Sequence, residues 1–459
     1  MTSSPAPPPA ATDVFAGPLP RRGLPRPALR LAHRVLSAGR GDVAQLRGWD
    51  RLITWRAHAT PRARWTALKT FLKLPARAAR GALRDVERFG DAVAARAGVS
   101  RRRQVVQLWW LAVRYGLDAR AYLDYQLYRA DRWPQAGAYL GLKEVNRVTQ
   151  FIKAHHGDRD ADVLYDKRRF DEWCREHELP TVSTVMELEQ GRVTRTGDGG
   201  ESLPPCDLFA KPSDGAGGSG ARRWRFEGGV YVDDAGRVMA AAEVLAELLV
   251  ASRGEVEPGR PRRILVQRRV SNHRALAPLT LGGLCTIRLH TYRWPGAASQ
   301  LLLAVYKMPV GHTAVDNFRF GGIVAPVDVE TGRLGQALTR SGPLLTEIER
   351  HPDTGAVIAG YDVPCWQDAV RLVRRAHDAV PSLATVGWDV AILDDGPVLV
   401  EGNTLPNVAL SQMPSGRPLG GTPLVACLNA HLRECFVPGP RGAASARTPS
   451  PVPRSRRTP

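Results

Sequence analysis

The sequence predicts an α+β protein in which a helical, basic N-terminal region precedes a larger body of mixed strands and helices. Between residues 25 and 133 apolar residues recur at spacings of three and four, which is the helical period. After about residue 140 short β-branched runs alternate with glycine loops and separate helices. We therefore expect a helical region at 21–137 and an α+β body at 138–436. The segments 1–20 and 437–459, rich in Pro, Ala and Ser, lack the apolar content to fold and are expected to be disordered.

The elements of each part can be assigned in order. In the helical region, 117–128 continues the helical pattern, with Asp118 as its expected N-cap. In the body, helices are expected at 166–177, 240–252 and 367–380. Strands are expected at 207–211, 229–232, 264–269, 286–292, 301–308 and 323–329. A body of this size can consist of two closely associated subdomains.

The positive charge is concentrated at the two ends of the sequence. The net charge is +19, but residues 134–436 carry 34 Lys and Arg against 36 Asp and Glu. Residues 1–133 carry 25 against 9, and residues 437–459 carry 5 against none. A partner that recognises positive charge would therefore bind outside the α+β body.

The cysteine spacing and the lengths of the apolar runs indicate the cellular compartment in which the protein is expected. The six cysteines show neither a C-x-x-C motif nor Cys/His spacing typical of zinc fingers, so neither a disulfide framework nor a structural zinc is indicated. No apolar run approaches 18 residues, and the N-terminus lacks a signal-peptide pattern. We expect a reducing, cytoplasmic location.

Residues 386–407 are expected to form a β-hairpin whose acidic residues bind a metal. The β-branched residues on both sides of Asp394-Asp395-Gly396-Pro397 predict two strands joined by a tight turn. Asp389 and Glu401 would then face each other, which is unfavourable unless a cation lies between them. Asn403 adds a neutral oxygen at a spacing that returns to the same face. Such hard oxygen ligands suit Mg²⁺ or Mn²⁺. The alternative is an exposed hairpin with ordinary surface carboxylates.

The segment KPSDGAGGSG, which begins at Lys211, indicates a phosphate-binding loop. Its glycines allow backbone N–H groups to approach phosphates, and the lysine adds a point charge. It is not a Walker A loop, because the lysine precedes the glycines. It matches the dinucleotide fingerprint only formally, since a strand, a turn and a strand follow instead of a helix. We expect a flexible flap over a nucleotide, and the alternative is an exposed linker. The glycines concerned are Gly215, Gly217, Gly218 and Gly220.

These motifs occur in an order that resembles the ATP-grasp superfamily. The lysine and glycine loop comes first, a strand carrying Gln267 follows, and Gly-Trp-Asp389 and Glu401-x-Asn403 lie more than 100 residues later. Three further motifs are similar to those of the sugar-transfer-associated ATP-grasp family, which is related to α-L-glutamate ligases. They are Thr286-Ile287-Arg288-Leu289, Asn317-Phe318-Arg319-Phe320-Gly321-Gly322 and Gly387-Trp388-Asp389-Val390. The resemblance covers about residues 115–432.

The resemblance implies roles for individual residues. ATP would lie between two β-layers, with Lys167, Lys211 and Lys307 on its phosphates. The strand at 264–270 would contact adenine through its backbone, although many superfamily members carry a glutamate where Gln267 stands. Arg288 and Arg319 would hold a substrate carboxylate or the transferred phosphoryl group, or else Arg319 would pair with structural acids.

The resemblance also implies a reaction. Superfamily members mostly activate a carboxylate through an acylphosphate, which an amine or similar nucleophile then opens. We therefore expect an ATP- and Mg²⁺-dependent, ADP-forming ligase in polysaccharide or peptide tailoring, whose partners are a small carboxylate and an acceptor. The histidines at 273, 290 and 312 are expected to be structural or to contact substrate. One alternative is an ATP-binding phosphotransferase that forms no amide.

The second alternative concerns the basic helical region. Arginine-rich amphipathic helices such as residues 61–86, with Trp65 and Phe71, could bind an anionic membrane surface. The protein would then be peripheral to the inner membrane face. Binding to nucleic acid is not favoured, and packing or substrate binding is the other expected role of this region.

Overall fold

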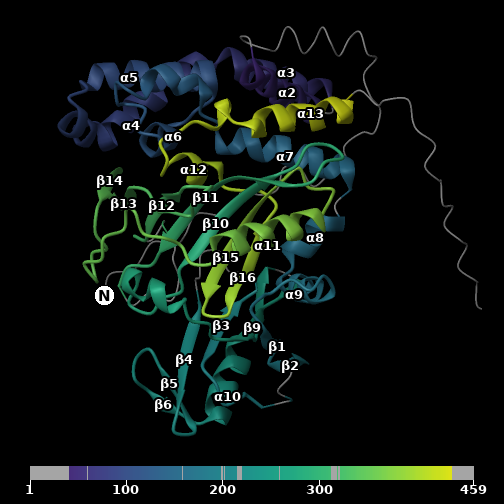
Figure 1. The fold of residues 1–459 in the computed structure, drawn as a ribbon. Helices are drawn as coiled ribbons and strands as arrows, with labels where there is room; N and C mark the ends of the chain where they lie inside the picture. The colour runs from purple at the N-terminus through teal and green to yellow at the C-terminus, as the bar shows by residue number, and fades with distance from the viewer. Residues whose placement is uncertain are drawn as a thin grey trace, which may run out of the picture.

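The fold has three layers (Figure 1). The computed structural model describes residues 41–436 apart from 59, 158, 198–199, 201, 214–219, 258, 312–317 and 319–320. A layer of helices lies at the top of the view, a seven-stranded sheet lies beneath it, and a second seven-stranded sheet with helix α10 lies at the bottom. The expected terminal disorder at 1–20 and 437–459 lies outside the described residues.

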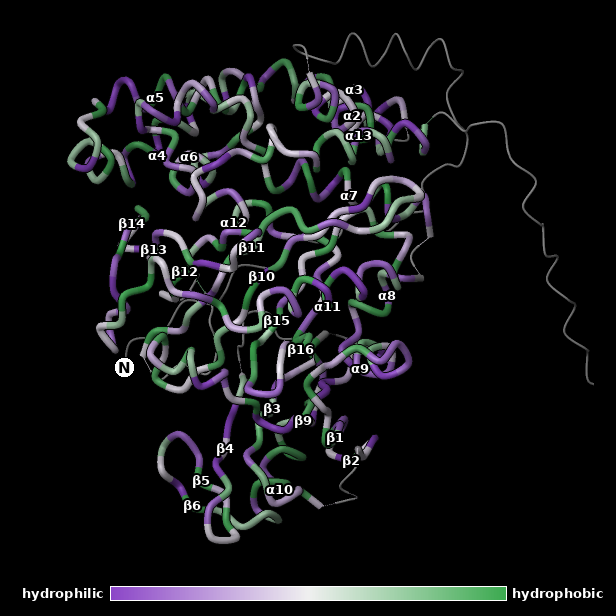
Figure 2. The backbone as a smooth tube through the Cα atoms, in the orientation of Figure 1, coloured by the Kyte–Doolittle hydropathy of each residue, from purple (hydrophilic) through white to green (hydrophobic). Residues whose placement is uncertain are grey.

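The helical layer is formed largely by the N-terminal region. Its helices are α2 (Asp42–Ala57), α3 (Pro61–Leu72), α4 (Leu74–Ala97), α5 (Arg101–Trp110), α6 (Ala119–Asp124), α7 (Leu142–His156) and α13 (Pro423–Phe436). Hydrophobic and hydrophilic residues alternate along these helices, as Figure 2 shows. A π-helical turn at Leu111–Tyr115 extends α5, and a 3₁₀ turn covers Trp133–Ala138. The expectation of a helical N-terminal region is confirmed from residue 42 onward.

Two details of the helical prediction are wrong. Residues 61–86 form two helices that break at Lys73, because Pro75 in the first turn of α4 lacks an N–H and its ring excludes a continuous helix. The helix expected at 117–128 ends at Asp124, and Gln126 has a φ of +52°. Its predicted cap is correct, since Asp118 Oδ1 accepts a 3.0 Å hydrogen bond from Ala121 N.

The lower sheet is antiparallel, in the order β2-β1-β9-β3-β4-β5-β6. Its strands are β1 (Thr184–Glu189), β2 (Arg192–Thr196), β3 (Leu208–Pro212), β4 (Arg222–Glu227), β5 (Val230–Asp233), β6 (Val238–Met239) and β9 (Arg263–Arg268). Helix α10 (Ala241–Ala251) packs on it through Val244 and Leu248. Two short strands, β7 (Glu255–Glu257) and β8 (Arg260–Pro261), form a separate two-stranded sheet and directly precede β9 in the sequence. The glycine loop joins antiparallel strands β3 and β4, as predicted.

The upper sheet is also antiparallel, in the order β14-β13-β12-β11-β10-β15-β16. Its strands are β10 (Thr286–Tyr292), β11 (Gln300–Met308), β12 (Ile323–Val327), β13 (Ala337–Ser341), β14 (Leu344–Ile348), β15 (Thr385–Leu393) and β16 (Gly396–Asn403). The strand expected at 323–329 ends at Val327, where Asp328 begins a turn by accepting bonds from the next residues. The other predicted strands and the helices near 166, 240 and 367 are present within a few residues of their expected bounds.

Helices cover both faces of the upper sheet. On one face α8 (Arg159–Tyr165), α9 (Lys167–Glu176) and α11 (Trp366–Asp378) share its largest apolar core. On the other face lie α12 (Val408–Gln412) and the helical layer. Short 3₁₀ helices occupy Arg274–Leu279 and Leu419–Gly421. Helices α2, α7 and α13 share one apolar cluster, so the helical layer contains residues from both sides of the expected boundary at 137/138. That boundary stays a prediction.

Buried polar residues fix the upper sheet to its helices. His290, on β10, contacts Thr385 Oγ1 at 2.7 Å and Ser411 Oγ of α12 at 3.2 Å. Burial lowers the pKa of His290 to about 3, so its ring is neutral and takes part as a hydrogen-bonding group. No helix in the described part of the chain is both long and apolar enough to cross a membrane.

Candidate functional site

A buried ion pair in the upper sheet forms the centre of the site. Arg288 on β10 lies directly opposite Asp389 on β15. Its Nε is 2.7 Å from Asp389 Oδ1 and its Nη2 is 2.9 Å from Oδ2. Lys307 Nζ of β11 approaches Oδ1 at 3.3 Å. Three neighbouring strands therefore each contribute one charged side chain to a single cluster.

The protonation of Asp389 follows from these neighbours. Burial by itself would raise the pKa of Asp389, whose side chain is 10% exposed. Arg288 and Lys307 outweigh burial and hold this pKa well below its usual range. Asp389 is therefore ionised near neutral pH.

The predicted hairpin places Glu401 and Asn403 beside this cluster. Strands β15 and β16 pair with Asp389 opposite Glu401 and Gly387 opposite Asn403, which confirms that the two acids face each other. The Asn403 amide lies between Glu401 and Arg288. With its oxygen toward Arg288 Nη2 and its nitrogen toward Glu401 Oε1, each contact is 3.3 Å. Two facing acids require positive charge nearby, and Arg288 and Lys307 supply part of it.

The Gly-Trp-Asp motif has a local structural reason. A Cβ on Gly387 would lie 3.1 Å from Cδ of Arg288 and 3.2 Å from Cβ of Pro406, so a larger residue would displace the arginine stem. Trp388 points to the opposite face, where it is fully buried and its Nε1 donates to Thr291 Oγ1 at 3.0 Å. Alternation along β15 thus directs Asp389 to the site and Trp388 to the core.

Two lysines from the lower part of the fold complete the charged group. Lys211 lies on β3, and Lys167 begins α9, which is capped by Asp166 through the backbone N–H of Arg168 at 2.9 Å. Burial, and then the charge of Lys167, lowers the pKa of Lys211 to about 8, while Glu401 opposes this shift. These couplings bring Lys211, Lys167 and Glu401 into one electrostatic group that spans both sheets.

The strand of the expected adenine hinge has the right position in the chain. β9 is the last strand of the lower sheet, and the chain passes from it to β10 of the upper sheet. Gln267 on this strand is partly buried, and its Nε2 donates to Val182 O at 3.3 Å. The side chain of Gln267 thus supports the neighbouring segment, and its contact with adenine stays a prediction.

Several predicted site residues lie outside the described residues. These are Arg319 and the loop glycines Gly215, Gly217 and Gly218. Gly220 is described and has a φ of +77°, a conformation that favours glycine. Of the three histidines, His290 is structural, His273 caps a 3₁₀ turn by accepting from Ala275 N at 3.1 Å, and position 312 lies outside the described residues.

Chemically, the arrangement suits a metal-bound polyphosphate. The charge of Lys167 lowers the pKa of Lys211, and an anion that binds both lysines would relieve their repulsion. Glu401 and Asn403 offer oxygens beside them, and Asp389 uses three of its four lone-pair sites on Arg288 and Lys307. The donor set therefore fits Mg²⁺ or Mn²⁺, whose ligands are carboxylate and amide oxygens.

The sequence did not reveal how the predicted site residues contact one another. The resemblance implies that Arg288 holds a substrate carboxylate or the transferred phosphoryl group, and the sequence predicts that Asp389 binds a metal. In the structure the two residues, 101 positions apart, form an ion pair with each other. Their register depends on which strands become neighbours, and no local pattern encodes this. The matching β-branched runs at 286–292 and 385–393 were the only available signal.

Comparison with known proteins gives a family match over most of the α+β body. The model of the family described as sugar-transfer associated ATP-grasp matches residues 146–424. No curated protein matches the chain.

Several solved ligases resemble the chain distantly. An L-amino acid ligase from Bacillus licheniformis is 13% identical with a TM-score of 0.33, over 60% of this chain and 49% of its own. A D-alanine–D-alanine ligase from Bacillus anthracis is 12% identical with a TM-score of 0.32, over 61% and 69%. The VanG D-Ala:D-Ser ligase from Enterococcus faecalis is 10% identical with a TM-score of 0.33, over 61% and 63%. The match spans about half of the L-amino acid ligase, so the assignment depends on the family match.

Proposed function

We propose that this chain, which belongs to the sugar-transfer-associated ATP-grasp family, is an ATP- and Mg²⁺-dependent ligase that joins a carboxylate to an amine or similar acceptor. Membership of the family supports ATP-dependent ligase activity in general. The observation that carries the finer proposal is the group of four cationic side chains around three oxygen-bearing ones at the junction of the two sheets. The cations are Lys167, Lys211, Arg288 and Lys307, and the others are Asp389, Glu401 and Asn403.

In this proposal the two sides of the group have different tasks. Lys167 and Lys211 hold the phosphates, and Glu401 and Asn403 hold the metal with a remaining lone pair of Asp389. The metal supplies charge neutralisation at the phosphates. Asp389 also fixes Arg288 and Lys307 with their charged ends toward the reacting groups, so that little reorganisation is needed when negative charge develops.

The reaction follows from this arrangement in two steps. A substrate carboxylate oxygen attacks the γ-phosphorus, the bond to the bridging oxygen of ADP breaks, and an acylphosphate forms. The acceptor nitrogen then attacks the carbonyl carbon, loses a proton, and inorganic phosphate leaves. Neither step requires a nucleophilic side chain, since phosphoryl transfer depends on in-line positioning and cationic clamps.

The test is ADP release by the purified chain with Mg²⁺ and a panel of amino acids and acidic sugars. A substrate pair should stimulate ADP release, and mass spectrometry should detect a product that has lost one water relative to the pair. Glu401→Gln should reduce the stimulated rate by about a hundredfold or more, because a metal ligand loses its charge. Glu176→Gln, at the exposed end of α9, is the matched control and should leave the rate unchanged.

Two outcomes would contradict the proposal. A phosphorylated acceptor without a ligated product would favour the phosphotransferase alternative. An unchanged rate in Glu401→Gln would show that the metal assignment is wrong.

Helix α3 supports a second role, binding to an anionic membrane surface. None of its residues is buried. Trp65 is 57% exposed, Phe71 66% and Leu72 69%, while the helix carries three basic residues and no acidic one. Lys69 Nζ lies 5.3 Å from the Trp65 ring centre, so charge and aromatic surface occur together. We propose that this face lies in the interface of an anionic bilayer, where apolar side chains and cations are both favoured.

Co-sedimentation of the full chain with vesicles tests this role. Binding should occur to phosphatidylglycerol-containing vesicles, weaken at high salt, and fall at least tenfold in the double variant Trp65→Ser/Phe71→Ser. Val238→Ser, which removes an equally exposed apolar side chain from β6, is the control. Equal binding of both variants, binding to neutral vesicles alone, preferential binding to duplex DNA or self-association through α3 would contradict the proposal.

A further inference from the structure

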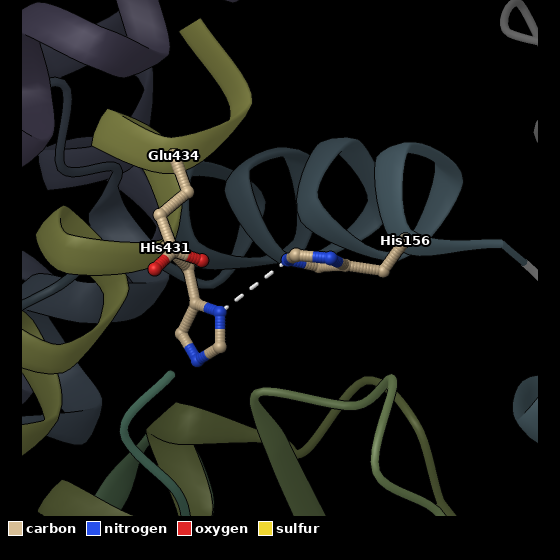
Figure 3. A group of neighbouring side chains, drawn as sticks. All are labelled: His156, His431 and Glu434. Carbon is tan, nitrogen blue, oxygen red and sulfur yellow. Dashed lines mark hydrogen bonds between the residues drawn. The ribbon is translucent and has the colours of Figure 1, made fainter. Parts of the chain in front are cut away.

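Three metal-ligating side chains meet in the helical layer, on elements separate from the nucleotide site. His156 is the last residue of α7, and His431 and Glu434 lie one turn apart on α13. Figure 3 shows the three side chains gathered between these two helices. One ligand atom from each of the three lies within 4.8 Å of the others. Residues 275 positions apart in the sequence therefore converge at one point.

The hydrogen bonding of His431 fixes which of its nitrogens is available. Its Nε2 lies 2.9 Å from the backbone oxygen of Arg293, which can only accept, so Nε2 carries the proton. Nδ1 then bears a lone pair and points toward His156. A metal-binding histidine commonly donates its second N–H to a backbone carbonyl in this way, which orients the ring and raises its basicity.

The separation of the two rings suits a shared cation. His431 Nδ1 and His156 Nε2 are 3.4 Å apart. This is longer than a usual N–H hydrogen bond. It equals the separation of about 3.4 Å between two ligand nitrogens that each lie about 2.05 Å from a tetrahedral zinc. A carboxylate oxygen of Glu434 lies within 4.8 Å of the ligand nitrogens of both rings.

The protonation states agree with this geometry. Burial, the charge of His431 and the charge of His155 lower the pKa of His156, and burial also lowers the pKa of His431 against the opposing effect of the Arg293 carbonyl and Glu434. Both shifts favour the neutral imidazole, which is the form that binds a metal.

We propose that His156, His431 and Glu434 bind Zn²⁺, or another divalent transition cation that prefers imidazole ligands, with water in the fourth position. Imidazole favours such cations over Mg²⁺, so the Mg²⁺ used with ATP would not compete. The ion joins the end of α7 to α13, two helices that also share an apolar cluster with α2. Its role is structural: it holds together two helices that flank the α+β body in sequence.

Zinc binding to the untagged full chain, after treatment with EDTA and dialysis, tests this site. Calorimetry should give one tight site per chain, Co²⁺ should give the absorption of a tetrahedral site, and the unfolding temperature should rise with the free zinc concentration. His156→Gln should abolish all three effects, and Glu434→Gln should weaken affinity ten- to a hundredfold. His155→Gln, the neighbouring exposed histidine that is not in the group, should behave like the wild type.

Since His156 and Glu434 are both exposed, their variants should unfold like the wild type when no metal is present. The absence of a tight zinc site in the wild type would overturn the proposal. So would a His156→Gln protein that binds zinc as tightly as His155→Gln.

Discussion

Asp389 and Arg288 face each other across β15 and β10 and form a two-point ion pair with contacts of 2.7 and 2.9 Å. The pair is buried, and Lys307 adds a second cation at 3.3 Å. Its two members come from the motifs that most clearly indicated function in the sequence. The same residues therefore determine both the stability of the upper sheet and the charge of the proposed active site.

Replacing Asp389 with Asn should destabilise the protein by about 3–5 kcal/mol, because Arg288 and Lys307, whose side chains are largely buried, would lose their anion. Urea unfolding of the metal-free protein measures this. Asp362→Asn is the control, since it removes an exposed partner of Arg333 at 3.1 Å and should cost about 1 kcal/mol or less. Equal effects of the two substitutions would contradict the assignment of Asp389 as a buried, structurally required charge.

The contribution of Asp389 to stability should disappear in acid. Because its pKa is lowered in the folded state, this contribution is complete above the unfolded pKa of about 3.9 and is lost as the pH falls through the folded pKa. The difference in unfolding free energy between wild type and Asp389→Asn, measured in EDTA, should therefore be constant from pH 7 to 5 and shrink below pH 4. A difference that stays constant down to pH 2.5 would contradict the shift.

Nucleotide affinity should depend on the charge of Lys211. With a pKa of about 8, this lysine is charged at pH 7 and must take up a proton to bind phosphate at higher pH. The affinity for Mg-ADP, measured by calorimetry, should therefore fall as the pH rises above 8, by up to about tenfold per pH unit. Lys211→Arg should bind with little change over pH 7–9.5, because arginine stays charged. A wild-type profile as flat as that of the variant would exclude Lys211 as a phosphate contact.

Gly387→Ala should perturb the site through Arg288. The added methyl group would lie 3.1 Å from Cδ of Arg288 and 3.2 Å from Cβ of Pro406, and overpacking of this kind costs about 1–3 kcal/mol. The unfolding midpoint should fall, and nucleotide-dependent activity should fall with it. The control is Gly81→Ala in α4. A Cβ at this position would have no atom within 4 Å, so the substitution should stabilise the helix by about 0.5–1 kcal/mol. A neutral Gly387→Ala would show that the strand can shift to accept a side chain.

The hairpin could be predicted because its determinants are local. Turn chemistry at 394–397 and alternating β-branched residues define the two strands and pair Val390 with Leu399. A one-residue register shift between Asp389 and Val390 then brings Asp389 opposite Glu401. The same reasoning located the glycine loop between two antiparallel strands. Most strands of both sheets were found from their composition in the same way.

The contacts between distant elements could not be predicted from sequence. Arg288 meets Asp389 only because β10 lies between β11 and β15, an order that depends on the packing of the whole sheet. The break at Lys73 does not show in the apolar period, which continues across Pro75. The group of His156, His431 and Glu434 follows from helix packing, so spacing of cysteines and histidines in the sequence gave no indication of it.

The shared cluster of α2 and α13 also bears on how the chain folds as it leaves the ribosome. These are the first and last helices of the described part of the chain, and Asn429 Nδ2 of α13 donates to the backbone oxygen of Asp42 at 2.9 Å. The apolar face of α2, including Leu46 and Trp49, thus has no native partner on α13 until almost 400 further residues have been synthesised. At translation rates of about 5–20 residues per second, this face lacks α13 for tens of seconds, and of the other two helices in the cluster only α7 is made early. The apolar cluster of the helical layer is therefore completed only when synthesis of the described part of the chain is nearly finished.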